Sequence, residues 1–361
     1  MNKRNISFEA LRVIFILYMV LHHLDTFNGI EIPSFSENIK KFCFEGFVGV
    51  NFFFMLSGLG CVLGYKDRLD ENKISSAGFL YNRFAKLYPA YFLFLILSVF
   101  LYNGGHFGKM KLFLMHTFML QTFPLTSNQA FGYNGVAWCV FASFFFYLIF
   151  IAIHKINFKE CLSYIAFLSV FIAVNILFHS EDGYVMTALF YTNPIFRLLD
   201  FLIGMAIGLY FKNHLPIHSC KMQIASILVF LSFLFVGAYS NISWLYKWSI
   251  YYLFPCAFLL VSFYGETRLS KTLFGHQFWL SLSSASMVIF LSHQQFLNLI
   301  KLHLPEPYCS YFYKNFMPWG ILLSLFFIVV LSLVINKYFE TPIYSLLIKL
   351  KNRRDAKGKI S

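Results

Sequence analysis

Long apolar runs separated by short polar segments recur along the whole chain. Many of them reach the ~20 residues that a helix needs to cross the hydrocarbon core of a bilayer. The pattern predicts an all-α integral membrane protein with about ten transmembrane helices around a polar cavity. The predicted helices cover roughly residues 8–26, 46–65, 84–103, 136–154, 160–178, 186–211, 222–239, 245–264, 283–302 and 317–336.

Two shorter features complete the predicted organisation. The run over residues 111–123 is too short to span a bilayer, and we expect an interfacial or re-entrant segment there. The first apolar run has no small-residue cleavage site, which favours a retained helix over a signal peptide. Because no soluble stretch is long enough for a second core, we expect one transmembrane domain over 1–345 and a basic cytoplasmic tail over 346–361.

Composition supports the membrane assignment. Apolar residues make up 58% of the 361 positions and charged residues only 12%, about half the ~25% of a soluble domain. This excludes a disordered chain, a collagen-like repeat and a disulfide-rich secreted domain. The seven cysteines form no CxxC motif, so we predict neither a disulfide framework nor a metal site.

The net charge of +13 follows the predicted topology. With the N-terminus assigned to the cytoplasm, 20 Lys and Arg fall in cytoplasmic segments and 7 in outer ones. This bias predicts that both termini are cytoplasmic, and it explains the charge better than a nucleic-acid partner does. We expect the tail to touch the lipid bilayer through anionic headgroups.

Two pairs of glycines within the predicted helices have the GxxxG spacing, Gly60/Gly64 in the second and Gly204/Gly208 in the sixth. Small residues at this spacing allow two helices to approach closely. We expect both pairs to lie at helix–helix contacts.

The first predicted helix carries charged and titratable side chains that lipid cannot satisfy. A charge at mid-membrane costs ~2.5–3.5 kcal/mol even on the insertion scale. Arg12 and His23 are eleven residues apart, which places them within ~20° of one helix face and ~16 Å apart along the axis. His22 lies off that face, so His23 is the stronger catalytic candidate. The alternative is a snorkelling arginine and a headgroup-facing histidine.

The start of the third predicted helix presents two cations on one face, Arg83 and Lys86. They are either a positive-inside anchor or a clamp for phosphate groups from the cytoplasm. Arg197 and Asp200, one turn apart, could form a structural ion pair or bind substrate, and His293 could be an interhelical donor. The candidates for lining the polar cavity and binding substrate are Asn51, Trp138, Ser143, Arg197, Asp200 and His293.

Seven segments in order resemble the membrane-bound acyltransferase-3 family, which includes bacterial polysaccharide O-acetyltransferases. Asn51 stands where the family has Asp, Lys86 where it has Arg, and Ser143 where Glu is frequent; Met287 and Phe290 stand where it has Tyr. The segments are an Arg-x10-His helix over 12–23, GVNFFFMLSG over 49–58, the basic element over 83–89, 138–147, RLLDFLIG over 197–204, 286–293 and Glu-Thr-Pro over 340–342.

The resemblance implies acyl transfer from acyl-coenzyme A to a hydroxyl group in the bacterial cytoplasmic membrane. Arg12, Arg83 and Lys86 would hold the phosphates of the donor. His23 would act as general base, or carry the acyl group itself, with Asn51 or Asp200 orienting its ring. The resemblance implies acetyl-CoA as the donor substrate and no permanently bound cofactor.

The expected partners are acyl-CoA, a surface or exported polysaccharide or other glycan, and the lipid bilayer, with no nucleic acid. The sequence permits a homo-oligomer without determining the oligomeric state. The main alternative is a transporter or flippase of a lipid-linked sugar, which would also need buried charges. Such folds show broken helices in matching halves, and the sequence has no internal symmetry.

Overall fold

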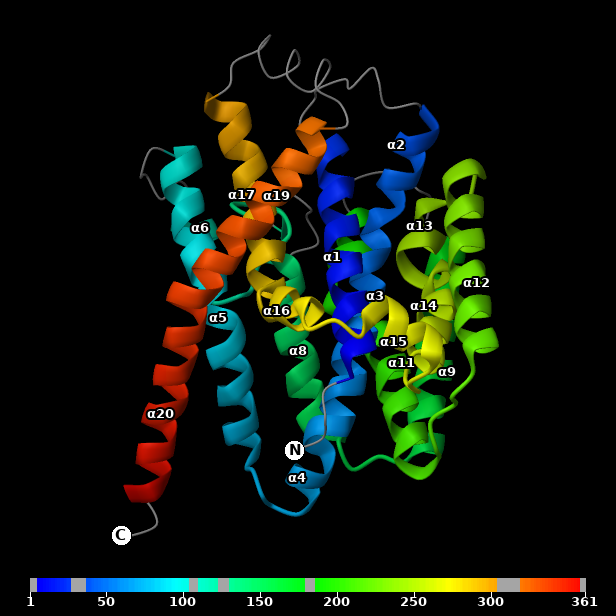
Figure 1. The fold of residues 1–361 in the computed structure, drawn as a ribbon. Helices are drawn as coiled ribbons and strands as arrows, with labels where there is room; N and C mark the ends of the chain where they lie inside the picture. The colour runs from blue at the N-terminus through cyan, green and yellow to red at the C-terminus, as the bar shows by residue number, and fades with distance from the viewer. Residues whose placement is uncertain are drawn as a thin grey trace.

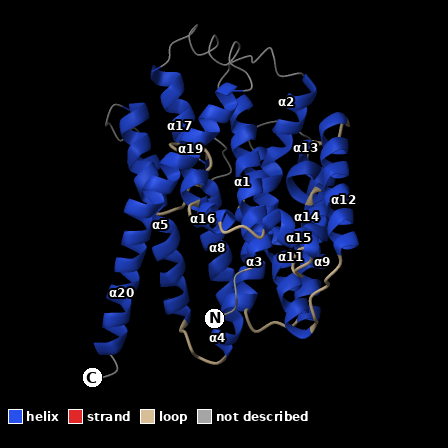
Figure 2. Cartoon of the chain, viewed as in Figure 1, coloured by secondary structure: helices blue, strands red, loops and turns tan. Residues whose placement is uncertain are grey.

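The computed structural model describes residues 5–26, 37–103, 110–122, 130–178, 186–303 and 319–357. Within these ranges every regular element is helical and no strand occurs (Figure 2). The predicted all-α class is therefore confirmed. The α-helices are α1 (Ile6–Thr26), α2 (Glu37–Phe44), α3 (Gly49–Cys61), α4 (Asp67–Asp70), α5 (Ser76–Asn103), α6 (Met110–Thr117), α8 (Trp138–Ile153), α9 (Phe158–Phe178), α11 (Pro194–Asn213), α12 (Cys220–Tyr239), α13 (Trp244–Tyr246), α14 (Leu253–Ser262), α15 (Arg268–Phe274), α16 (Phe278–Ser284), α17 (Ser286–His303), α19 (Trp319–Ile335) and α20 (Thr341–Lys357).

Eight helical segments in the described ranges are long and apolar enough to cross a membrane. They correspond to eight of the ten predicted helices. The other two correspond to α8 and α17. Helix α8 is strongly apolar but has only 16 residues, and α17 carries the polar run Ser292-His293-Gln294-Gln295, which lowers its hydropathy.

Several predicted helices differ in extent. The second is part of a continuous helical stretch over 38–70, in which a 3-10 turn, η1 (Glu45–Val48), and a π-helical turn, η2 (Val62–Lys66), join α2, α3 and α4. The last continues from α19 through the π-helical turn η5 (Asn336–Glu340) into α20. The predicted tail therefore begins inside a helix that runs to Lys357.

Two other predicted helices are interrupted. The sixth divides into a π-helical turn, η3 (Thr187–Thr192), and α11, with extended backbone at Asn193. The Asn193 side chain accepts a hydrogen bond from the backbone N–H of Ile195, and Pro194 takes the first helical position. Asn is favoured at the residue before a helix, because its side chain accepts a hydrogen bond from a free backbone N–H. Pro is favoured at the first helical position, because it has no N–H that would need a partner. The eighth divides at Tyr252 between η4 (Lys247–Tyr251) and α14.

Glycine allows α3 and α11 to pack with their backbones in contact. A Cβ at Gly204 would lie 1.8 Å from the Met55 carbonyl oxygen, and one at Gly58 would lie 2.0 Å from the Phe201 carbonyl oxygen. The expectation for Gly204/Gly208 is thus confirmed. That for Gly60/Gly64 is wrong, because among the described residues a Cβ at either position would meet nothing within 4 Å.

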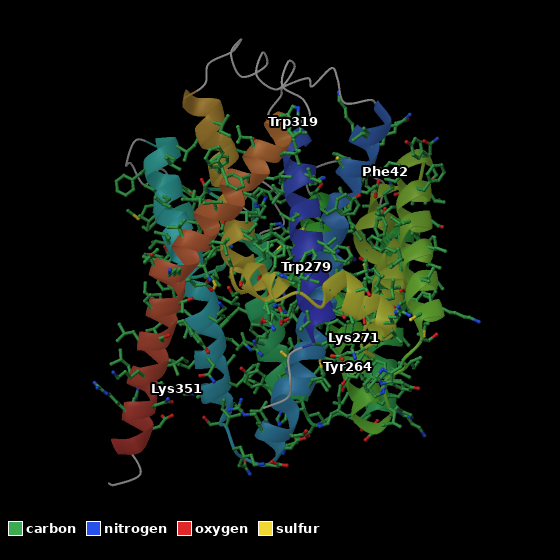
Figure 3. All side chains as sticks on the ribbon, in the orientation of Figure 1. Phe42, Tyr264, Lys271, Trp279, Trp319 and Lys351 are labelled. Atoms are coloured by element: carbon green, nitrogen blue, oxygen red, sulfur yellow. The ribbon has the colours of Figure 1, made fainter. Side chains whose placement is uncertain are left out.

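The bundle places α1 among the other helices, with α12 at one edge and α20 at the opposite edge (Figure 1). Large apolar side chains of α9, α12 and α19 are exposed, among them Phe167, Leu228 and Phe326. Figure 3 shows side chains projecting outward along α12 at one edge of the bundle. Such a surface is unusual on a soluble monomer and fits contact with lipid.

Helix α1 begins, and α20 ends, on the same side of the bundle, which we call the terminal side; the opposite side is the far side (Figure 1). On the terminal side the Lys351 ammonium donates to the Gly78 carbonyl and to the Asn82 side chain. These bonds tie α20 to the start of α5.

Candidate active site

Two cavities lie one after the other along α1. The first, about 290 Å³, is nearer the terminal side and is lined by Arg12, Arg83 and Lys86; we call it the cation cavity. The second, about 470 Å³, lies towards the far side and is lined by His22 and His23; we call it the histidine cavity. The predicted separation of Arg12 and His23 along one helix thus places them in neighbouring cavities.

Four side chains line both cavities, and we call them the collar. They are Met19 from α1, Val50 from α3, Cys139 from α8 and Phe290 from α17. Met19 lies between Arg12 and His23 in sequence, so the junction falls between the two functional groups. The cavities adjoin at a ring that is almost entirely apolar.

Two of the three cations of the cation cavity are paired with acids. Arg12 Nη1 lies 2.7 Å from Glu9 Oε2 and donates to Ser283 Oγ at 3.2 Å. Lys86 Nζ lies 2.6 Å from Oε1 of Glu340, whose side chain is fully buried. The second pair joins the basic element of α5 to the Glu-Thr-Pro segment near the end of the chain.

Arg83 differs from the other two cations. Its guanidinium carbon lies 4.3 Å from the ring centroid of Tyr65, 5.1 Å from that of Tyr147 and 5.5 Å from that of Phe79. No carboxylate pairs with it in the described part of the chain, and its Nε has no hydrogen-bond partner there. Aromatic faces stabilise a cation by only ~0.5–2 kcal/mol. Arg83 therefore retains most of its capacity to bind an anion.

Imidazole rings gather at the histidine cavity. The ring centroid of His23 lies 4.9 Å from that of His22 and 5.1 Å from that of His293. His293 is fully buried on α17; its Nδ1 lies 3.3 Å from the Ile289 carbonyl oxygen and its Nε2 has no hydrogen-bond partner in the described ranges. His293 thus supports the wall behind His23 rather than lining the cavity itself.

Three other predicted residues form a buried network between α3 and α11. Asn51 Nδ2 donates to Asp200 Oδ1 at 2.8 Å, and Arg197 Nη2 lies 3.0 Å from Asp200 Oδ2. Arg197 also donates to the Trp248 carbonyl. All three side chains are buried and none lines either cavity, so this geometry favours the structural alternative for the Arg197–Asp200 pair.

Trp138 and Ser143 both lie on α8 and face different cavities. Trp138 lines the histidine cavity, and its ring lies 4.9 Å from that of Tyr191. Ser143 lines the cation cavity, but its hydroxyl donates to the Cys139 carbonyl of its own helix at 2.8 Å. The predicted substrate-binding residues are therefore divided among the two cavities, the buried network and, for His293, the wall behind His23.

Some residues of the site were missed or given no role by the sequence reasoning. Glu9 stands one helical turn before Arg12, a spacing that signals an ion pair. Glu340 belongs to a recognised motif, yet nothing in the sequence joins it to Lys86. His22 lines the histidine cavity although helical geometry places it off the Arg12 face. Trp244 and Trp248, at the start of the interrupted eighth helix, line the same cavity. No local signal in the sequence reveals that interruption.

Comparison with known proteins identifies the family. The family model of acyltransferase-3, described as an acyltransferase domain, matches residues 5–337. Searches of curated proteins and of solved structures give no match. The matched range contains the cation cavity, the collar and the histidine cavity. Because the match covers most of its length, the chain belongs to the acyltransferase-3 family and is a multi-pass membrane acyltransferase.

Proposed function

We propose that this acyltransferase moves an acetyl group from cytoplasmic acetyl-CoA to a hydroxyl of a surface or exported glycan at the bacterial inner membrane. The observation that carries the proposal is the pair of adjoining cavities, with cations in one and His23 in the other. The excess of Lys and Arg on the terminal side supports a cytoplasmic location for both termini. The cation cavity would then be reached from the cytoplasm.

The cation cavity fits the polyanionic end of the donor. Arg83 lacks an acidic partner among the described residues and offers a planar guanidinium that can bind phosphate in bidentate fashion. Arg12 and Lys86 add positive charge near it, although each is paired with an acid. With the phosphates held there, the extended arm of the donor would pass the collar and deliver the thioester towards His23, ~16 Å from Arg12 along α1.

His23 would act as the general base. Its neutral imidazole accepts the proton of the acceptor hydroxyl while the oxygen attacks the thioester carbonyl. The carbon–sulfur bond then breaks, and the coenzyme A thiolate takes up a proton, which leaves an acetyl ester and free coenzyme A. An acetyl-imidazole intermediate on His23 would give the same products in two steps. His22 and His293, whose rings flank His23, would hold that ring in place.

The test is transfer of labelled acetate from acetyl-CoA to the purified exported polysaccharide of the cell. We expect His23→Gln to abolish transfer, because neither base nor nucleophile remains at that position. The protein should still accumulate in the membrane and bind acetyl-CoA. Cys61→Ser, a change at a buried residue outside both cavities, is the matched control. Full transfer by His23→Gln would overturn the assignment of His23.

A further inference from the structure

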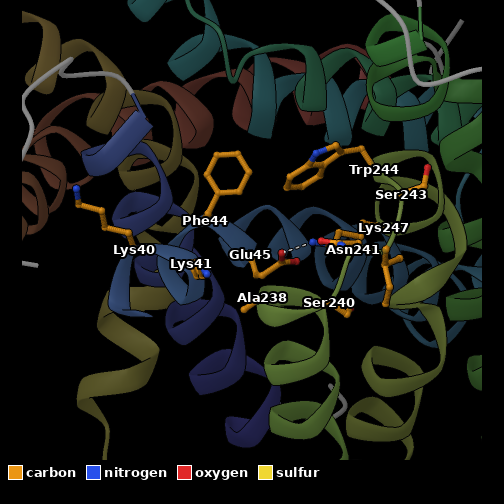
Figure 4. Close-up of a pocket in the computed structure, with 11 residues that line it drawn as sticks. Lys40, Lys41, Phe44, Glu45, Ala238, Ser240, Asn241, Ser243, Trp244 and Lys247 are labelled. Atoms are coloured by element: carbon orange, nitrogen blue, oxygen red, sulfur yellow. Dashed lines mark hydrogen bonds and ion pairs between the residues drawn. The ribbon is translucent and has the colours of Figure 1, made fainter. Parts of the chain in front are cut away.

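A third cavity opens on the far side, beside the histidine cavity (Figure 4). It has a volume of about 550 Å³, and we call it the outer pocket. Helix α2 contributes its last turns, and the segment between α12 and α13 contributes the opposite wall. The side chains that matter are Lys40, Lys41, Phe44, Asn241, Ser243 and Trp244. Neither the roles proposed above nor the sequence motifs account for this pocket.

The outer pocket adjoins the histidine cavity through two aromatic rings. Phe44 and Trp244 line both spaces. Their ring centroids are 5.1 Å apart and their planes are inclined by 77°, and Figure 4 shows the two rings standing over the pocket. The Phe44 ring also lies 5.2 Å from the ring of His22. A ligand that contacts this pair would be separated from the His22 ring by one side chain, and His22 in turn adjoins His23.

A buried ion pair holds Trp244 in place. The Lys247 ammonium lies 4.4 Å from the Trp244 ring centroid and 2.7 Å from Glu45 Oε1. The Tyr252 hydroxyl donates to the other oxygen of Glu45 at 2.5 Å. Lys247 and Glu45 are both nearly fully buried. The aromatic surface is therefore fixed before any ligand arrives, which lowers the entropy cost of binding.

The described lining residues of the pocket carry more positive than negative charge. Glu45 is the one carboxylate among the described lining residues, and Lys247 neutralises it. Lys40 and Lys41 add two cations at the rim; Lys41 is exposed, with its ammonium 5.4 Å from the Tyr239 ring centroid. Anions approaching from the far side are attracted to such a site.

We propose that the outer pocket binds an acidic sugar residue of the acceptor glycan. The apolar face of a sugar ring would stack on Phe44 and Trp244, as amphipathic ligands do on aromatic side chains. Its carboxylate would face Lys41, and its hydroxyls would meet Asn241 and Ser243. This inference rests on the proposed function, and it adds that the acceptor is anionic and is recognised next to the hydroxyl to be acetylated.

The test measures binding of two matched probes to the full chain in phosphatidylcholine nanodiscs by titration calorimetry. One probe is an octasaccharide of alternating glucuronic acid and N-acetylglucosamine. The other is its carboxyl-reduced form, in which each glucuronic acid has become glucose. We expect the acidic probe to bind about tenfold more tightly, because hydrogen bonds to a charged group are the stronger ones.

Three variants locate the interaction. The double variant Lys40→Gln, Lys41→Gln should lose the preference for the acidic probe. Trp244→Ala should lower the affinity for both probes about tenfold. Lys111→Gln, which removes an exposed lysine on α6, should change neither affinity. Unchanged acetyl-CoA binding shows that each variant is folded.

The outcomes separate this inference from the proposed function. Three results would overturn the assignment of the outer pocket as an acidic-sugar site. They are equal affinity for the two probes, no binding of either probe, and a preference for the acidic probe that survives the double lysine change. Loss of the preference in nanodiscs containing phosphatidylglycerol would also overturn it, since the lysines would then bind lipid headgroups. Selective binding without acetyl transfer would instead retain the pocket and contradict the proposed reaction.

Discussion

The partners of each cation in the cation cavity distinguish residues that look alike in the sequence. Arg12 forms an ion pair with Glu9, and Lys86 forms one with Glu340. Arg83 is surrounded by aromatic rings and lacks such a partner in the described ranges. The three were predicted as one clamp, but the structure makes Arg83 the strongest candidate for direct contact with the donor.

Replacing Arg83 should therefore impair donor use more than replacing Lys86. We expect Arg83→Gln to raise the KM for acetyl-CoA roughly ten- to hundredfold, as loss of a charge-assisted hydrogen bond costs ~1.5–3 kcal/mol. Lys86→Gln should raise it roughly fivefold or less, because screened or paired surface charges contribute only ~0–1 kcal/mol. Initial rates at varied acetyl-CoA check both values. Equal effects of the two changes would contradict the distinction.

The Asn51–Asp200–Arg197 network should matter for stability. Asp200→Ala leaves the Arg197 guanidinium buried without its acid, and we expect a loss of ~3–5 kcal/mol in the free energy of unfolding. Asn51→Ala removes one hydrogen bond to a charged acceptor and should cost ~1.5–3 kcal/mol. Denaturant unfolding of the purified protein in detergent measures both.

Ser143→Ala is the control for these two variants. Among the described residues its hydroxyl bonds only to a carbonyl of its own helix, so the free energy of unfolding should change by no more than ~0.5 kcal/mol. If Asp200→Ala unfolds at the wild-type denaturant concentration and loses only acceptor binding, the network belongs to the substrate site instead.

Residue pairs within one helix were predictable from the sequence, and pairs between helices were not. Helical periodicity alone placed Arg12 and His23 on one face. The contact of Lys86 with Glu340 and that of Asn51 with Asp200 depend on how distant helices pack, and no local pattern encodes that. This is also why the candidates for orienting His23 were Asn51 and Asp200, whereas His22 and His293 are the rings that flank it.

At the scale of helices, apolar length predicted where the spans lie but not where they break. The interruption at Asn193 follows from its cap on Ile195 and from Pro194, signals that are visible only once a helix start is suspected there. The π-helical turns that extend the second and last helices leave no such signal. The GxxxG motif predicted a helix–helix contact correctly at Gly204/Gly208 and wrongly at Gly60/Gly64. The spacing does not reveal whether the glycine face of a helix meets a neighbouring helix.

The contact of α3 with α11 gives a sharp test of helix packing. Gly204→Val should prevent folding, because its Cβ would overlap the Met55 carbonyl oxygen and the two backbones would have to separate. Gly60→Val is the matched control, since nothing lies within 4 Å of its Cβ. Size-exclusion profiles of fluorescently tagged protein in detergent report the folded fraction. A normal profile for Gly204→Val would contradict the close approach.

At the scale of the whole molecule, the collar lies between the cation cavity and the histidine cavity. We expect Cys139→Phe to lower kcat at least tenfold, because a larger side chain would narrow the junction that the thioester must pass. Overpacking of this kind costs ~1–3 kcal/mol, so folding should survive. Cys139→Ser, nearly the same size, should remain active. Transfer at the wild-type rate by Cys139→Phe would show that the donor does not pass the collar.

The collar has a further consequence for the cell. A route wide enough for an acetyl group from one face of a membrane to the other is also a route for protons and small ions. Met19, Val50 and Phe290 make the collar between the two cavities apolar, and apolar constrictions shed water and block hydrated ions. In the proposed reaction the collar would admit a thioester and exclude hydrated ions, so outward transfer of an acetyl group would leave the membrane potential intact.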